Sequence, residues 1–316
     1  MIPLLDTTRD IPARRRRGGS GTSTDRTGNA ARGKAECAVT SNVSVHFPLD
    51  GVAVATMNRP DRLNAMNVAL ISDLSDALQE LAANNSCRVV ILTGAQRAFS
   101  SGLDLKDAGL VPNVDGLSVG RIALRSMRHY SRVVTMIRDM PQVVIAAVNG
   151  VAFGGGMCLA MACDLRFGSQ SASFNATGIV NGLTAAEMGV SWLLPRQVGA
   201  AVSNDLLLTG RVVEAAEAYR LGLISRLVAD DELLPSTLET AARMARFSPY
   251  GLTMTKTATW ASLEISSLAA AIEFEDRNQL MLGFTDNLPE AISAFAAKRD
   301  PNYRDDPRRD IWPEPV

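Results

Sequence analysis

Two short runs of mostly β-branched residues, each ending in glycine, constrain the fold of this chain more than any other feature. They are Arg88-Val-Val-Ile-Leu-Thr-Gly94 and Val143-Val-Ile-Ala-Ala-Val-Asn-Gly150. Runs this short and this apolar are typical of strands that are buried on both faces of a sheet. Helical patterns precede and follow them, so strand and helix alternate. This alternation predicts an α/β core of stacked β-β-α units rather than two unrelated domains.

Local patterns predict the elements around these two strands. Alternating apolar residues on both sides of Pro48-Leu-Asp-Gly51 predict a β-hairpin. A helix with Asn67 as its N-cap is expected next; its apolar stripe is Leu70, Leu74, Leu78 and Leu81. A second helix is predicted over residues 121–138. The side of it that we expect to face the core holds Met127, Tyr130, Val134 and Ile137.

Composition divides the chain into four parts. Residues 1–40 hold eight Lys/Arg against four Asp/Glu and no apolar periodicity, so we expect a disordered basic tail. The four arginines at residues 14–17 could touch nucleic acid, anionic lipid or CoA phosphates, although a solvated tail or a misassigned start codon explains them more simply. We expect the core in residues 41–200, amphipathic helices in residues 201–303 and a tail in residues 304–316.

Charge and cysteine content exclude several classes of protein. Beyond residue 40 the chain has 24 Lys/Arg against 29 Asp/Glu, and this acidic balance argues against a nucleic-acid-binding protein. No stretch approaches the roughly 18–20 apolar residues that a membrane span needs. The four cysteines have no disulfide-framework or metal-ligand spacing, and two histidines are too few for a multi-histidine metal site. We therefore expect reduced thiols, no metal and a cytoplasmic protein.

Glycine-rich turns follow the two apolar strands. They are Phe99-Ser-Ser-Gly-Leu-Asp-Leu105 and Asn149-Gly-Val-Ala-Phe-Gly-Gly-Gly-Met157. Glycine lets the backbone approach a ligand closely, and unpaired N–H groups at the start of a helix favour negative charge. Two such turns on adjacent strands could aim two N–H donors at the oxygen of a thioester that becomes an enolate. A triple glycine alone is more often a tight turn or a phosphate cradle.

Six segments follow one another in a characteristic order. They are Met57-Asn-Arg-Pro-Asp-Arg-Leu-Asn-Ala-Met66, Phe99-Ser-Ser-Gly-Leu-Asp-Leu105, Asn149-Gly-Val-Ala-Phe-Gly-Gly-Gly156, Ala162-Cys-Asp-Leu165, Leu208-Thr-Gly210 with Glu217-Ala218 and Leu221-Gly-Leu223, and Ala294-Phe-Ala-Ala-Lys-Arg299. In this order they resemble the crotonase superfamily, also called the enoyl-CoA hydratase/isomerase family, over about residues 43–303. The resemblance implies a spiral of β-β-α units and a helical C-terminal trimerisation region. It also implies a homotrimer or hexamer that acts on an acyl-CoA thioester and needs no separate cofactor.

The resemblance implies roles for eight residues. The backbone N–H groups of Leu103 and Gly155 would form an oxyanion hole, and Glu187 would be the catalytic acid or base. Five residues would contact CoA, and they are Arg62, Leu63, Ala65, Phe295 and Lys298. Arg62 and Lys298 are alternatively solvated surface charges, and Phe295 is alternatively an anchor of a C-terminal core.

The chain departs from the family's hydratases at both of their catalytic glutamates. Cys158 stands at the first position, where a buried small side chain is the simplest interpretation. Thr177-Gly178 stands at the second. One acid matches a variant found in double-bond isomerases of the family: Glu187, eight residues before Pro195. The alternative for Glu187 is a surface carboxylate at a helix N-terminus.

Three functions remain open at this point. The first is an enzyme of the hydratase/isomerase type that hydrates a 2-enoyl-CoA or moves a double bond. Isomerisation is favoured, because one carboxylate can remove a proton and return it at another carbon. The second is a CoA-ester-binding protein with little activity. The third is a thioester hydrolase or decarboxylase, in which Cys158 would act as a nucleophile. Asp104 and Asp164 are expected to hold backbone N–H groups, and His129 is a reserve candidate for the acyl pocket.

Overall fold

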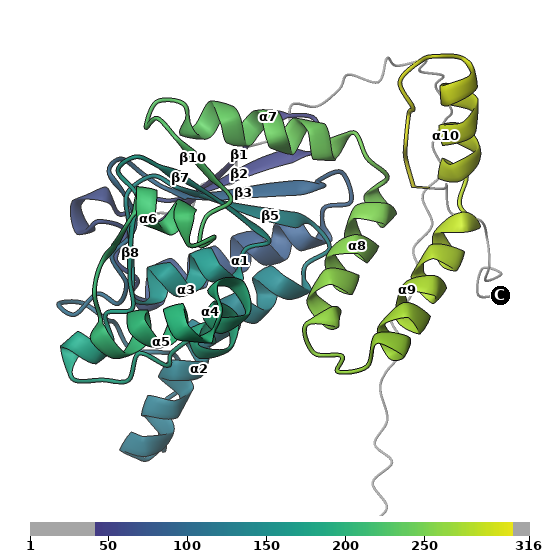
Figure 1. The fold of residues 1–316 in the computed structure, drawn as a ribbon. Helices are drawn as coiled ribbons and strands as arrows, with labels where there is room; N and C mark the ends of the chain where they lie inside the picture. Colours follow the sequence, from purple (N-terminus) through teal and green to yellow (C-terminus); the bar gives the residue numbers. More distant parts are fainter. Residues whose placement is uncertain (1–41, 306–316) are drawn as a thin grey trace, which may run out of the picture. The chain divides into compact units, whose positions relative to one another are not determined.

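A computed structural model describes residues 42–305 of this chain. The expected basic tail of residues 1–40 and most of the C-terminal tail lie outside these residues. Between residues 42 and 305, no helix is both long enough and apolar enough to cross a membrane. The described residues form an α/β fold with two mixed sheets, as Figure 1 shows.

The larger sheet has six strands in the order β1-β2-β3-β5-β7-β10. Its strands are β1 (Val43–Leu49), β2 (Val52–Met57), β3 (Val89–Gly94), β5 (Val143–Val148), β7 (Leu165–Ser169) and β10 (Arg226–Val228). The first two form the predicted antiparallel hairpin, and every later pair is parallel. The predicted strands β3 and β5 are neighbours in its centre, where helices cover both faces.

The smaller sheet has four short strands in the order β4-β6-β8-β9. They are β4 (Ala98–Ser100), β6 (Val151–Phe153), β8 (Ser173–Asn175) and β9 (Val213–Glu214). The first three are parallel to one another, and β9 is antiparallel to β8. Each glycine-rich turn therefore ends a strand of this smaller sheet rather than coming directly after β3 or β5. Runs of three residues are too short for strand periodicity to be read from the sequence.

Helices follow the strands along the chain. The long ones are α1 (Val68–Ala83), α2 (Val119–Asp139), α7 (Leu233–Ala245), α8 (Pro249–Ser262) and α9 (Leu268–Gly283); the shorter ones are α3 (Gly155–Ala162), α4 (Val190–Val198), α5 (Ala200–Thr209), α6 (Ala215–Arg220) and α10 (Asn287–Ala296), with 3-10 turns η1 (Pro60–Arg62) and η2 (Ile179–Asn181). Asn67 caps α1 as predicted, because its side chain accepts a hydrogen bond from the Leu70 amide at 2.9 Å.

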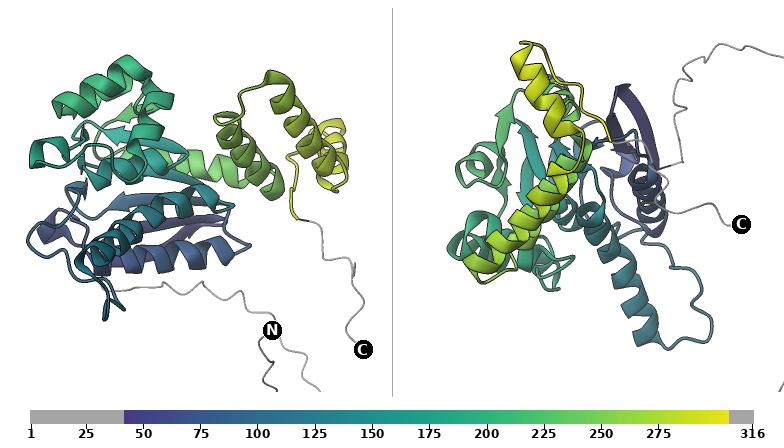
Figure 2. Two further views of the ribbon diagram at one scale, coloured as in Figure 1. Left: turned by 90° about the horizontal axis from the view of Figure 1, so that it is seen from below. Right: turned by 90° about the vertical axis from the view of Figure 1, so that its right-hand side faces the viewer.

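The six-stranded sheet separates two hydrophobic clusters. Alternate residues of a strand point to opposite faces. On β3, Val89 and Ile91 face α7, whereas Val90 and Leu92 face the layer that contains α1, α2 and α3. Figure 1 shows α7 on one side of the sheet, and the left view of Figure 2 looks onto the opposite helical layer. Burial on both faces explains why β3 and β5 are continuously apolar.

Two expectations about the helices need correction. Tyr130, Val134 and Ile137 of α2 are buried as expected, but Met127 is 57% exposed, because only the C-terminal half of α2 packs on the core. The region after residue 200 is not purely helical. It also supplies β9 and β10, and β10 pairs with β7 at the edge of the larger sheet.

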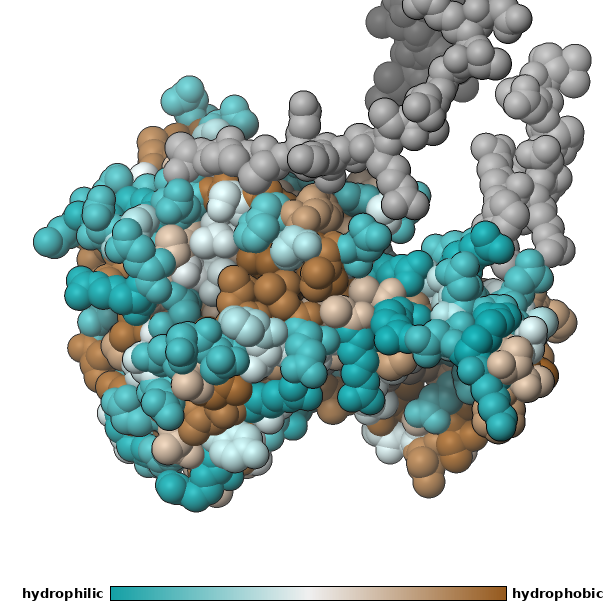
Figure 3. Space-filling model, turned by 90° about the horizontal axis from the view of Figure 1, so that it is seen from above, coloured by the Kyte–Doolittle hydropathy of each residue, from teal (hydrophilic) through white to brown (hydrophobic). Residues whose placement is uncertain are grey.

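The last helices expose apolar side chains. Helix α9 packs against α8, and α10 packs against α9. Their exposed residues include Leu280, Met281, Phe284, Ile292 and Phe295. Figure 3 shows hydrophobic side chains at the surface, both near the centre of its view and toward the C-terminal helices on its right. This surface is compatible with the homo-oligomer that the resemblance implies.

Candidate active site

Three turns meet at one edge of the smaller sheet. Strands β4, β6 and β8 are parallel neighbours, so their carboxyl ends lie at the same edge. Leu103 follows β4, Gly155 follows β6 and Thr177 follows β8. The topology therefore brings together the two predicted oxyanion-hole positions and the segment in which hydratases carry their second glutamate.

The first two turns touch each other. A Cβ atom placed on Gly102 would lie 2.7 Å from the carbonyl oxygen of Phe153 and 3.6 Å from the Cα of Gly154. Gly102 has φ +90° and Gly154 has φ +50°, a backbone region that favours glycine. A larger residue at Gly102 would therefore force the two turns apart.

The amides of Leu103 and Gly155 have no hydrogen-bond acceptor among residues 42–305. Leu103 and Met66 form an isolated parallel β-bridge. In this bridge the Met66 amide donates to the Gly102 carbonyl, and the Asp104 amide donates to the Met66 carbonyl. The N–H of Leu103 therefore points away from Met66. Gly155 is the first residue of α3, so its N–H has no partner within the helix. Within residues 42–305, neither amide donates a hydrogen bond.

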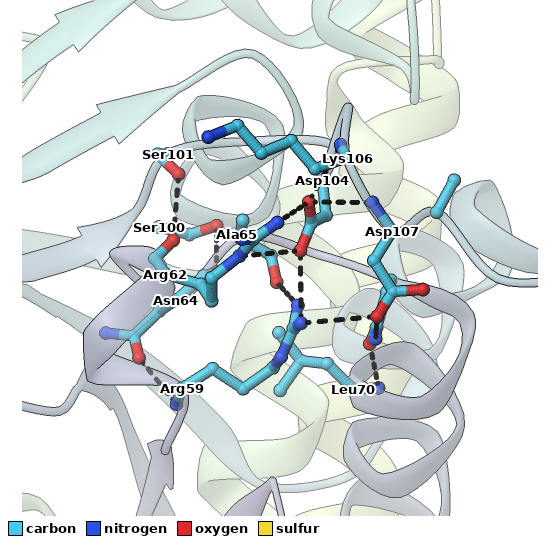
Figure 4. A network of polar contacts seen from close by, with 12 residues as sticks. Arg59, Arg62, Asn64, Ala65, Leu70, Ser100, Ser101, Asp104, Lys106 and Asp107 are labelled. Atoms are coloured by element: carbon cyan, nitrogen blue, oxygen red, sulfur yellow. Dashed lines mark hydrogen bonds and ion pairs between the residues drawn. The ribbon is translucent and has the colours of Figure 1, made fainter.

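The segment that contains the predicted CoA contacts lies alongside the first turn. The Ser101 amide donates to the Leu63 carbonyl at 3.0 Å, and the Met66 amide donates to the Gly102 carbonyl at 2.7 Å. Leu63 itself has φ +51°. Arg62, Leu63 and Ala65 are therefore next to Leu103, as Figure 4 shows for Arg62 and Ala65 beside Ser101 and Asp104.

Asp104 organises this neighbourhood. Its carboxylate is 3% exposed and accepts hydrogen bonds from Arg62 Nη2 at 2.6 Å and Arg59 Nη2 at 3.0 Å, and from the amides of Lys106 and Asp107 at 3.1 Å (Figure 4). Burial alone would raise the pKa of Asp104, but these donors outweigh it and lower the pKa to about 2. The expected structural role of Asp104 is confirmed.

Glu187 faces the second turn. A Cβ atom placed on Gly154 would lie 3.5 Å from Glu187 Oε1 and 2.5 Å from Thr177 Oγ1. Glu187 is half-buried, and burial raises the pKa of its carboxyl group. Glu187 precedes the first residue of α4 by three residues, so it does lie near a helix N-terminus, as the alternative hypothesis expected. Its side chain, however, points toward Gly154 rather than out to the surface.

The residue after Glu187 has an unusual backbone. Met188 has φ +45°, which is rare for a large side chain. A Cβ atom placed on Gly155 would lie 3.0 Å from Sδ of Met188 and 2.0 Å from Cε of Met66, so both methionine side chains pack against this glycine. Leu183, in contrast, is 64% exposed, so it does not enclose the carboxylate.

The segment that carries Glu187 packs against both Cys158 and Gly178. The Cys158 thiol donates to the Glu187 carbonyl oxygen at 3.6 Å. A Cβ atom placed on Gly178 would lie 2.2 Å from the Thr184 carbonyl oxygen, well inside contact distance. Larger side chains at residues 158 and 178 would therefore collide with residues 184–187.

Cys158 is poorly suited to be a nucleophile. It is 1% exposed, and burial, followed by the charge of Glu187, raises the pKa of the thiol well above its usual range. Cys87 and Cys163 are also buried, and the described cysteines are free thiols as expected.

Sequence reasoning missed Thr177 as a member of the site. Its hydroxyl lies over Gly154 beside the carboxylate of Glu187, and no hydrogen bond within residues 42–305 engages it. The motif comparison did place Thr177 next to the missing second glutamate, but spacing alone could not show that its side chain turns toward Gly154.

Four other candidates lie elsewhere. Phe295 is 88% exposed on α10, which excludes a core anchor in this chain, and Lys298 is exposed just after that helix. Asp164 Oδ2 accepts from the Val144 amide at 2.7 Å and pairs with Lys256 at 3.0 Å, so its role is structural. His129 is half-buried, with Nε2 3.3 Å from the Val68 carbonyl oxygen, which links α2 to α1.

Comparison with known proteins agrees with this geometry. The family model for enoyl-CoA hydratase/isomerase matches residues 49–306. The probable enoyl-CoA hydratase EchA12 of Mycobacterium tuberculosis is 48% identical over 267 residues, which is 84% of this chain and 94% of that protein.

Two solved structures are also similar. A probable enoyl-CoA hydratase/isomerase from Mycobacterium abscessus has a TM-score of 0.81 and 43% identity, and the match covers 85% of this chain and all of that one. A monofunctional enoyl-CoA isomerase from M. smegmatis has a TM-score of 0.63 and 43% identity, over 74% of this chain and 99% of that one. This chain therefore belongs to the enoyl-CoA hydratase/isomerase family of the crotonase superfamily.

Proposed function

We propose that this protein is an acyl-CoA isomerase that moves a carbon–carbon double bond and uses Glu187 as its one proton-carrying carboxylate. The observation that carries the proposal is the packing of residues 184–187. This segment directs the Glu187 carboxylate toward Gly154 and packs against residues 158 and 178, the positions that the motif comparison aligns with the two hydratase glutamates. Hydration needs water held between an acid and a base, whereas isomerisation needs a single group.

The thioester carbonyl would bind at the two free amides. Its oxygen accepts hydrogen bonds from the N–H groups of Leu103 and Gly155, and the positive end of α3 adds to the stabilisation. Each such donor is worth about 3–4 kcal/mol at the transition state. The adenosine part of CoA would lie along residues 62–65, and Phe295 and Lys298, which are both exposed, would reach it from a second subunit.

The proton then moves between two carbons of the acyl chain. Glu187, as a carboxylate, removes a proton from C2 of a 3-enoyl thioester. The electrons of the broken C–H bond delocalise into a dienolate whose negative charge lies on the thioester oxygen. Protonated Glu187 returns the proton to C4, and the double bond is left between C2 and C3. No atom is gained or lost, and the raised pKa of Glu187 suits a group that must both accept and donate a proton.

Product identification tests the proposal. Purified full-length protein is incubated separately with 2-enoyl-, 3-enoyl- and 3-hydroxyacyl-CoA, and products are identified by liquid chromatography with mass spectrometry. We expect 3-enoyl-CoA to become 2-enoyl-CoA with no change in mass. Release of free CoA would instead support a thioester hydrolase, and binding without any product would support a CoA-ester-binding protein.

A further inference from the structure

Helix α2 carries a row of arginines on its outer face. Arg121, Arg125, Arg128 and Arg132 are separated by four, three and four residues, which places them on one side of a helix. The buried residues of α2 (Tyr130, Val133, Val134 and Ile137) lie on the opposite side. All four arginines are exposed, so the row faces away from the core.

The charge of this row is not neutralised by the residues that the structure describes. Of the residues 42–305, none forms an ion pair with these four arginines, and Arg125 donates one hydrogen bond, to the Asn113 carbonyl. The only acidic residue of α2 is its last, Asp139. Four unpaired positive charges over about 16 Å of helix contrast with the acidic balance of the rest of the chain.

Three of the four arginines lie in the N-terminal half of α2, which has few contacts with the core. No residue of α2 before Tyr130 is buried. In Figure 1 and in the right view of Figure 2, this N-terminal half extends beyond α1 and α3. This half of α2 is therefore the part of the helix that is open to a partner from outside the described residues.

One exposed apolar side chain, that of Leu124, borders the arginines. Leu124 is three residues after Arg121 and four before Arg128, so it lies beside both. It is 51% exposed, and Met127, three residues further along, is also exposed. An exposed helix with basic residues beside apolar ones is typical of segments that lie at the surface of a membrane.

We infer that the arginine face of α2, defined by Arg121, Arg125, Arg128 and Arg132 with Leu124 at its edge, docks the protein on an anionic lipid surface. The guanidinium groups would bind lipid phosphates, for which their planar fork is well matched. Leu124 would enter the layer between head groups and acyl chains. An acidic protein could supply the charge, but a flat bilayer also accommodates the exposed Leu124 side chain.

Vesicle sedimentation tests this inference. Full-length protein is mixed with vesicles of phosphatidylcholine alone or with 30% phosphatidylglycerol, at about 50 and 300 mM salt. The variant Arg121→Gln/Arg125→Gln/Arg128→Gln keeps helix-forming residues. Its matched control is Arg97→Gln/Arg243→Gln/Arg277→Gln, which removes three exposed arginines from other elements. Circular dichroism and thioester turnover establish that both variants are folded.

The wild type and the control should sediment with anionic vesicles at low salt and not with neutral ones. The α2 variant should bind about 10²-fold more weakly, because each arginine near an anionic surface contributes about fivefold. Equal binding by the α2 variant would overturn the inference, as would equal binding to neutral vesicles. No sedimentation, together with retention of the wild type on immobilised polyglutamate, would assign the face to an acidic protein instead. A change in oligomeric state of the α2 variant would assign it to a second copy.

Discussion

The carbonyl oxygen of Glu187 lies 3.6 Å from Sγ of Cys158, so the residue whose carboxylate faces Gly154 rests directly on Cys158. The small residues at positions 158 and 178 and the approach of Glu187 to Gly154 are thus parts of one packing arrangement. A small side chain at residue 158 and no side chain at residue 178 leave room for residues 184–187 to approach Gly154.

Introducing a glutamate at residue 178 should not create a hydratase. We expect Gly178→Glu to lose isomerase activity at least 10²-fold without gaining hydration, because its Cβ would collide with the Thr184 carbonyl and displace Glu187. Even Gly178→Ala should show most of this loss. Gly283→Ala, at a site with open space in α9, is the matched control. Wild-type turnover by Gly178→Ala, measured with 3-enoyl-CoA, would contradict this packing account.

The first glycine turn should be equally intolerant. Gly102→Ala combines an unfavourable φ of +90° with a contact of 2.7 Å to the Phe153 carbonyl oxygen, so the Leu103 amide should shift. Loss of one oxyanion donor lowers kcat about 10²–10³-fold. The measurement is steady-state kinetics together with binding of a non-reactive thioether analogue of the substrate, with Gly120→Ala as control. An unchanged kcat would remove Leu103 from the proposed oxyanion hole.

The pH dependence of activity should report Glu187. Burial raises the pKa of this carboxyl group, and its ionised form is the base, so kcat/KM should fall with decreasing pH at a midpoint above the ordinary carboxyl range. Folding stability follows from the same shift. The folded state holds the proton more tightly, so this group's favourable contribution is complete below the unfolded pKa and is lost as pH rises through the folded pKa. Thermal unfolding at pH 7–8 should therefore give a higher Tm for Glu187→Gln than for the wild type, and a lower Tm would contradict this.

Asp104 should matter for stability rather than chemistry. Asp104→Asn leaves Arg59 and Arg62 without their carboxylate, and we expect a loss of about 3 kcal/mol in the free energy of unfolding. Asp107→Asn, at an exposed carboxylate 3.9 Å from Arg59, should cost less than about 1 kcal/mol. Because the folded pKa of Asp104 is lowered to about 2, its contribution is present above the unfolded value of about 4 and lost as pH falls toward 2. Urea unfolding at pH 7 and pH 3 checks both statements, and equal stability of the two variants at pH 7 would refute them.

Long periodic segments were predictable from the sequence. The leucine stripe of α1 with its Asn67 cap and the apolar runs of β3 and β5 reflect local propensity and burial that point the same way. The boundary of packing on α2 was not predictable in this way. Met127 belongs to the apolar stripe of α2, but the buried part of this helix begins only at Tyr130.

The site was predictable only in part. The family motifs named Leu103, Gly155 and Arg62 in three separate segments, and the structure brings these segments together. The strands that align the turns are three residues long, and the direction of the Glu187 and Thr177 side chains depends on contacts between distant segments. Such contacts leave no local pattern in the sequence. The position of the Thr177 hydroxyl and the packing of residues 184–187 against Cys158 and Gly178 could therefore be found only in the structure.

The most direct test of the single-carboxylate account is turnover of 3-enoyl-CoA by Glu187→Gln. The matched control is Glu239→Gln, which neutralises an exposed carboxylate on α7. Glu187→Gln should lower kcat about 10²–10⁴-fold, the usual value of a positioned acid–base group, while affinity for a non-reactive thioether analogue stays the same. Glu239→Gln should behave as the wild type. A Glu187→Gln protein that converts 3-enoyl-CoA at the wild-type rate would contradict the account.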